Sequence, residues 1–125
     1  MSKRDAFYQG ITGDQGVIWP ETPQAQQAQL EALFGATTMG VLDTVVSRRF
    51  TDDEQHNRLV KEVAASTLYW LFCKLDQFPG AHLTLAAESL DEPAHSLGVV
   101  NDEELRLLFF DWLEQFSDTV TEADL

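Results

Sequence analysis

The sequence predicts a mainly α fold, a compact bundle of about four helices with a small β-hairpin before the last helix. Three observations lead to this prediction. Apolar residues recur at three- and four-residue steps over most of the chain, two capping-box motifs precede the clearest of these runs, and only two short segments alternate as strands do. With 125 residues, 44% of them hydrophobic, the chain can build one core, so we expect a single domain over residues 1–125.

Residues 1–20 are expected to form an irregular N-terminal arm that packs on the core. Gly10, Gly13 and Gly16 interrupt any regular period. The arm is nevertheless too apolar for a free tail, since it carries Phe7, Tyr8, Ile11, Val17, Ile18 and Trp19.

Two helices are predicted between residues 22 and 50. Thr22 followed by Pro23 is a favourable helix start, because the hydroxyl can cap free amides and proline at the first helical position loses no hydrogen bond. Gly35 is the expected end of this first helix. The second helix is predicted over 38–50, where apolar residues again follow helical steps.

The longest predicted helix runs from Thr51 to Phe78, with Thr51 as N-cap, Glu54 completing a capping box, and Pro79-Gly80 as its end. Its second half is apolar nearly all round, which is typical of a helix buried on several sides. We therefore expect it to be the central and most buried helix, with Trp70 in the core.

A β-hairpin and a last helix follow. Residues 82–86 alternate as a strand does and could pair with residues 97–100. Asn101 and Glu104 repeat the capping-box form. The last helix carries a continuous apolar stripe of Leu105, Leu108, Phe109, Trp112, Leu113, Phe116 and Val120. We expect Trp112 to share one core with Trp70.

Charge is distributed very unevenly along the chain. The protein has 8 basic and 21 acidic residues, a formal net charge of −13, and residues 75–125 hold 12 of the acids but only one base, Arg106. Five acids are predicted to line the side of the last helix away from the apolar stripe: Glu104, Asp111, Glu114, Asp118 and Glu122. Such a row is either a solvated face that keeps the domain soluble or a preorganised surface that steers a basic partner.

The sequence contains no recognisable catalytic or cofactor motif. His56, His82 and His95 lie on different predicted elements and lack metal-ligand spacing, so we expect no metal site and no cofactor. Cys73 lies among apolar residues, where burial favours an inert thiol. Direct nucleic-acid binding is not expected, because Arg48-Arg49 is a minor basic pair, and we expect those arginines to pair with acids of the C-terminal half.

These observations predict a non-catalytic acidic protein that binds and neutralises or escorts a basic protein, most concretely an immunity or inhibitor protein for a toxin such as a nuclease. The predicted partner-binding residues are the five acids of the last helix. Three alternatives remain open: a nucleic-acid-mimic inhibitor, an acidic secretion chaperone, and a small enzyme with an unrecognised site. Without a signal peptide or a continuous apolar span, a cytoplasmic protein with no membrane partner is expected.

Overall fold

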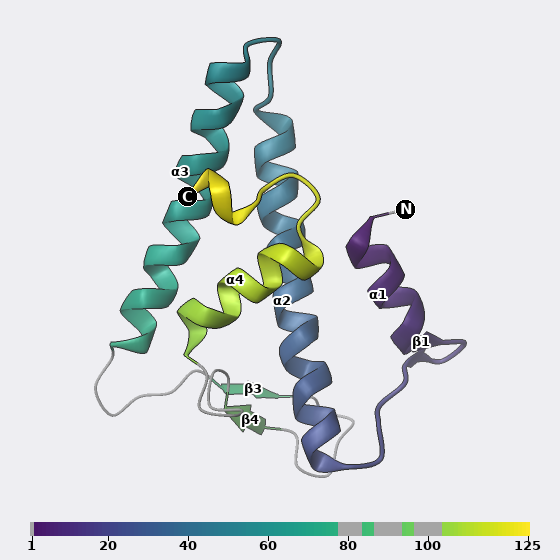
Figure 1. The fold of residues 1–125 in the computed structure, drawn as a ribbon. Coiled ribbons are helices and arrows are strands. Elements are labelled where there is room, and N and C mark those ends of the chain that lie inside the picture. The colour runs from purple at the N-terminus through teal and green to yellow at the C-terminus, as the bar shows by residue number, and fades with distance from the viewer. Residues whose placement is uncertain (1, 78–83, 87–93, 97–103) are drawn as a thin grey trace.

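The computed structural model describes residues 2–77, 84–86, 94–96 and 104–125 (Figure 1). It is mostly helical, with four α-helices and a two-stranded antiparallel hairpin before the last of them, as the sequence predicts. The helices are α1 (Lys3–Ile11), α2 (Pro23–Arg48), α3 (Glu54–Asp76) and α4 (Leu105–Phe116). The remaining elements are β1 (Thr12–Gly13), β2 (Gly16–Val17), β3 (Thr84–Ala86), β4 (Ala94–Ser96) and a 3₁₀ turn, η2 (Glu122–Asp124).

Helices α2 and α3 form a long antiparallel hairpin, and the two helices diverge from their connecting loop (Figure 1). Helix α4 crosses one side of this hairpin and contacts both of its helices. Helix α1 lies beside α2 and touches the end of α4, while η2 returns to α3. The short helix α4 therefore joins all the other helices into one packed unit.

The N-terminal arm is more regular than the sequence predicts, because it begins with a helix. Ser2 and Asp5 form a reciprocal capping box that starts α1. Gly10 lies within α1, whereas Gly13 and Gly16 pair across the tight turn between β1 and β2, where Gly16 has a φ of 110°. The rings of Phe7 and Phe116 lie 5.0 Å apart, which brings α1 to the end of α4.

The predicted break at Gly35 is wrong, since α2 is one continuous helix of 26 residues. Thr22 and Pro23 do start it, and the Thr22 side chain accepts a hydrogen bond from the Ala25 amide at 3.2 Å. Gly35 serves packing instead: a β-carbon at this position would lie 2.4 Å from the Trp112 indole. The missing side chain therefore lets α4 approach the middle of α2.

The core is built mainly by α2 and α4, so the prediction that α3 is the most buried helix is wrong. Helix α3 buries only Ala65, Phe72 and Cys73, whereas α2 and α4 bury six residues each. Trp112 is 3% exposed, as predicted, but Trp70 is 60% exposed and does not belong to the core. The reason is that α4 covers one face of α3, and the second apolar face of α3 points away from α4.

Three helix and strand boundaries also differ from the predictions. The N-cap of α3 is Asp53, whose carboxylate accepts from the Gln55 amide at 2.9 Å, while the Thr51 hydroxyl accepts from the Asp53 amide. Strand β3 pairs with β4, which needs a shorter connection than the predicted pairing with 97–100. Residues 97–100 lie outside the described part of the chain.

Helix α4 begins at Leu105 with Glu104 as N-cap, and Asn101, the predicted cap, lies outside the described residues. Glu104 makes no capping bond with its side chain. Instead the Asp76 carboxylate at the end of α3 accepts from the amides of Leu105 and Arg106, at 2.9 and 3.0 Å. A carboxylate at the positive end of the helix dipole thus ties α4 to α3.

Helix α2 is also long and apolar enough, by length and composition alone, to cross a membrane. The core helix of a soluble protein meets the same test. In this structure the buried residues of α2, among them Met39, Leu42 and Val46, belong to the same core as those of α4.

Candidate functional site

The five acids predicted to bind a partner are all solvent-exposed, but they do not form one helical row. Asp111 and Glu114 lie on α4, and Glu104 is its N-cap. Asp118 and Glu122 lie beyond the helix, which ends at Phe116. The prediction that the last helix continues to Val120 and carries all five acids is therefore wrong.

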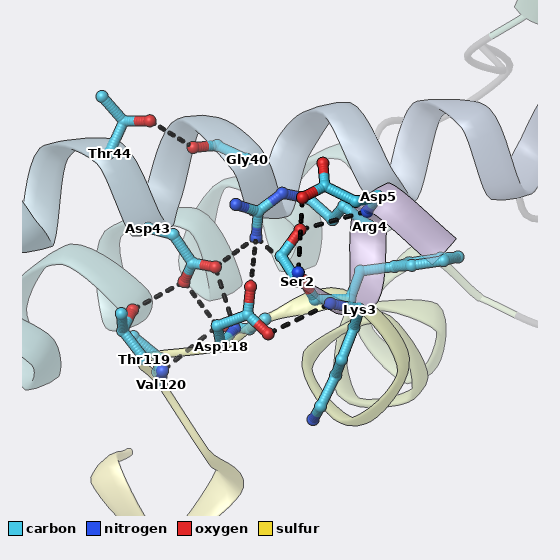
Figure 2. Close-up of polar contacts among 12 residues, drawn as sticks. Ser2, Lys3, Arg4, Asp5, Gly40, Asp43, Thr44, Asp118, Thr119 and Val120 are labelled. Atoms are coloured by element: carbon cyan, nitrogen blue, oxygen red, sulfur yellow. Dashed lines mark hydrogen bonds and ion pairs between the residues drawn. The ribbon is translucent and has the colours of Figure 1, made fainter. Parts of the chain in front are cut away.

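Helix α4 ends early because the buried carboxylate of Asp43 binds the chain that follows it (Figure 2). The hydroxyls of Ser117 and Thr119 donate to Asp43 Oδ1 at 2.7 and 2.6 Å, and the Asp118 amide donates to Oδ2 at 2.9 Å. These bonds require an extended backbone, and Ser117 accordingly has φ −87° and ψ 132°. The end of α4 is thus determined by a residue on α2.

Arg4 of α1 completes this cluster. Its guanidinium pairs with the Asp43 carboxylate, donates to the Phe116 carbonyl at 2.9 Å, and lies 3.7 Å from Asp118 Oδ2 (Figure 2). Burial raises the pKa of Asp43, but the hydrogen bonds it accepts outweigh burial, so its pKa lies below the ordinary value of 3.8. Asp43 is therefore an ionised, fully hydrogen-bonded structural group that joins α1, α2 and the segment after α4.

The structure divides the five acids into paired and unpaired ones. Asp118 is paired, because it lies near Arg4 and its Oδ1 accepts from the Lys3 amide at 3.2 Å. Glu104 is paired with Arg106 at 2.7 Å. Arg106 is the single base that the sequence places near the row, whereas the cation beside Asp118 comes from the N-terminal helix.

The other three acids have no ion pair within the described part of the chain. They are Asp111, Glu114 and Glu122. The Lys3 ammonium lies close to one of them, since it donates to the Glu114 carbonyl at 2.9 Å. Of the five predicted acids, those without an ion pair thus lie on α4 and on η2.

The predicted pairing of Arg48 and Arg49 with acids of the C-terminal half is not present among the residues that the structure describes. Among the described residues, the cations that meet C-terminal acids are Arg4, Lys61 and Arg106, and Lys61 lies 3.6 Å from Asp124. The reason is geometric: Arg48 and Arg49 lie at the loop end of the hairpin, whereas α4 crosses nearer to its middle (Figure 1).

In residues 2–77 and 104–125, no three His, Cys, Asp or Glu side chains are grouped so that they could hold one metal ion. Cys73 is buried, and a hydrogen bond with it raises the pKa of Tyr69 above the ordinary value of 10.0. The Tyr69 phenol therefore stays protonated at neutral pH. His56 lies 3.0 Å from the Arg49 carbonyl and joins the two ends of the loop between α2 and α3.

Two apolar grooves lie along α2. One, of about 400 Å³, lies between α2 and α3 and is lined by Val45, His56, Leu59, Val60, Val63 and Ala64. The other, of about 460 Å³, lies between α1 and α2 and includes Tyr8, Gly40, Val41 and Val45. Val45 lines both grooves, so they meet on the outer side of α2.

The sequence analysis does not predict two features of the structure, the buried Asp43 cluster and the exposed face of α3. The Asp43 cluster had one signal, an acid placed between the apolar residues Leu42, Val45 and Val46, where only a partnered carboxylate is tolerated. The exposure of α3 had no local signal, because spacing shows that a face is apolar but not whether another element covers it.

Comparison of the chain with protein-family models, with curated proteins and with solved structures finds no match.

Proposed function

We propose that the protein is a non-catalytic binding protein that recognises a basic protein, most concretely an immunity or inhibitor protein that neutralises a toxin such as a nuclease. One observation carries the proposal: Asp111, Glu114 and Glu122 are exposed and have no ion pair among the described residues, in a chain with a net charge of −13. Exposed carboxylates held on a packed helix attract a cationic partner and raise its association rate.

The structure also supports a division of roles within the five acids. Asp118 and Glu104 already have cations beside them, so a partner gains less from contacting them. Asp111 and Glu114 stand on the outer side of α4, whose inner side is fixed in the core by Trp112 and Phe116. A rigid support keeps the two carboxylates ready for binding, with little conformational entropy left to lose.

The test compares two variants with the same change in net charge. One carries Asp111→Asn, Glu114→Gln and Glu122→Gln, and the other carries Asp14→Asn, Glu21→Gln and Asp52→Asn at exposed acids away from α4. Each tagged protein is used to capture partners from its native host, and association kinetics with the captured protein are measured at low and high salt.

We expect the wild type and the control variant to capture one basic protein at equal stoichiometry. The α4 variant should associate more slowly and lose most of the salt dependence, because steering charges act mainly on the association rate and are screened over about 8 Å at physiological ionic strength. Equal loss in both variants would mean that only net charge matters. Capture of an acidic protein, or of none, would contradict the proposal.

A further inference from the structure

The outer side of α4 is amphipathic rather than purely acidic. Four residues share the side of the helix opposite its buried stripe: Leu107, Phe110, Asp111 and Glu114. Their spacing of i, i+3, i+4 and i+7 makes them neighbours along that side. Leu107 is 50% exposed and Phe110 is half-buried, while both carboxylates are exposed. The acids proposed to attract a basic partner therefore stand beside apolar side chains that the partner can cover.

Aromatic rings on α3 extend this surface. The centre of the Tyr69 ring lies 5.3 Å from that of Phe110 and 5.8 Å from that of Trp70. Tyr69 thus touches both a ring of α4 and the indole that follows it on α3. Trp70 is 60% exposed, so most of this indole meets solvent. We name Tyr69, Trp70, Leu107 and Phe110 the α3–α4 patch. Aromatic side chains of this kind are enriched at protein–protein interfaces.

The charged residues around the α3–α4 patch leave two carboxylates for a cation. Two bases border the patch: Arg106 is paired with Glu104 at 2.7 Å, and Lys74 lies on α3 one turn beyond the exposed indole. In the part of the chain that the structure describes, neither base forms an ion pair with Asp111 or Glu114. The patch therefore combines exposed apolar surface with acids that can accept a partner's cation.

We propose that the α3–α4 patch binds an arginine-bearing segment of the basic partner, an inference that rests on the function proposed above. One guanidinium stacks on the indole of Trp70, and neighbouring cations of the segment meet Asp111 and Glu114. Arginine suits this surface better than lysine, because its planar guanidinium is weakly hydrated and stacks on aromatic rings. The lysine ammonium is compact and strongly hydrated, so it gains less from the same ring.

The charges and the rings have different effects on binding. Exposed carboxylates act mainly on the association rate, whereas an aromatic anchor acts mainly on the dissociation rate. Tryptophan and arginine are also among the residues that contribute most to the affinity of protein interfaces. A second copy of this chain is a poor occupant of the patch, because a two-fold contact would set Asp111 and Glu114 of one copy against the same acids of the other.

The experiment measures binding of two fluorescent peptides of equal charge, nona-arginine and nona-lysine, to the full chain by anisotropy at physiological ionic strength. Trp70→Leu is the test variant, because it removes the indole but keeps an apolar side chain. Phe50→Leu is the matched control, since Phe50 is a 39% exposed ring at the loop end of the α2–α3 hairpin. A third variant carries Asp111→Asn and Glu114→Gln. Thermal melts should match the wild type, since all these side chains are exposed.

We expect the wild type to bind nona-arginine more tightly than nona-lysine. Trp70→Leu should weaken nona-arginine binding by about two- to fivefold, the contribution of one exposed cation–π contact, and should weaken nona-lysine binding less. Trp70→Phe should retain part of the preference for arginine, because a smaller ring remains. Phe50→Leu should change neither affinity, and the variant without the two acids should bind both peptides more weakly.

If Trp70→Leu weakens both peptides equally, or neither, the inference is overturned while the proposed function stands. The same holds if Phe50→Leu removes the preference for arginine to the same extent. If the variant without the two acids binds both peptides as tightly as the wild type does, the proposed function loses its support. A wild type that binds neither peptide would overturn the inference, and partner capture then decides the proposed function independently.

Discussion

The inner and outer faces of the α2–α3 hairpin are both apolar in sequence, yet only one is buried. On the inner face, Met39, Val46 and Ala65 are fully buried against α4. On the outer face, Val41 and Val63 remain more than half exposed. The comparison teaches that apolar spacing predicts where a helix can pack, whereas burial depends on whether another element reaches that side. Here a single helix of 12 residues makes the difference.

The largest test of this comparison uses the two tryptophans. Trp112→Ala removes a side chain in contact with Phe34 and Phe72, and it should lower the free energy of unfolding by about 3–5 kcal/mol. Trp70→Ala removes an exposed ring and should lower it by less than about 1 kcal/mol in the monomer. Both are measured by urea denaturation at low protein concentration. Equal losses would mean that Trp70 is part of the core after all.

The second test removes the negative charge of Asp43, which is buried between α1, α2 and the segment after α4. Asp43→Asn keeps the shape of the side chain but weakens the pair with Arg4 and the bonds from Ser117 and Thr119. The expected loss is about 2–4 kcal/mol at neutral pH, because bonds to a buried charged group are the costly ones to weaken.

The same variant has a predicted pH dependence. The pKa of Asp43 is lower in the folded protein than its ordinary value of 3.8, so the stability it contributes is complete above that value. As pH falls below 3.8 through the folded pKa, the carboxylate becomes protonated and the contribution disappears. The difference between wild type and Asp43→Asn should therefore shrink in unfolding experiments below pH 3.8. A constant difference would assign the effect to shape rather than charge.

The third test concerns the close contact between α2 and α4. Gly35→Ala places a β-carbon 2.4 Å from the Trp112 indole, so the ring or the helix must shift. We expect a net loss of about 1–2 kcal/mol, even though alanine favours the helix, because overpacking a core outweighs the gain in propensity. Gly10→Ala in α1 is the control, since nothing lies within 4 Å of its added carbon. A stabilised Gly35→Ala protein would show that the two helices are not held together at this point.

Local chemistry in the sequence predicts much of this fold, and several of the failures depend on contacts between distant segments. Thr22-Pro23, the apolar stripe of α4 and the segment containing β3 follow from capping, helical period and alternation, and the structure confirms them. The prediction at Gly35 is wrong because glycine commonly ends a helix, whereas here its missing side chain makes room for the Trp112 indole. The end of α4 depends on the contact with Asp43, and the exposure of Trp70 depends on which side of α3 the other elements cover. Both arise between distant segments, so the residue pattern within one helix does not predict them.

The candidate site was predictable only as a set of exposed acids. The spacing opposite the stripe of Trp112 and Phe116 predicts their exposure, and all five are exposed, but only Asp111 and Glu114 occupy helical positions on α4. Their pairing does not follow, because Arg4 and Lys3 approach Asp118 from more than 100 positions away in sequence. Such ion pairs arise from the tertiary fold alone.

The smallest test compares acids that have a cation of another element beside them with exposed acids that have no ion pair. Asp118 is exposed but lies beside Arg4 and Lys3 of α1, so Asp118→Asn should lower the free energy of unfolding by up to about 1 kcal/mol, the range of partly exposed ion pairs. Asp111 and Glu114 are bare and repel each other three residues apart, so neutralising both should raise stability by about 0.2–0.5 kcal/mol. Urea denaturation at low and high salt measures both effects, and added salt should shrink the two differences toward zero because it screens attraction and repulsion alike. If neutralising Asp111 and Glu114 instead destabilises the protein, these carboxylates support the fold, and the acidic surface proposed for partner binding loses its basis.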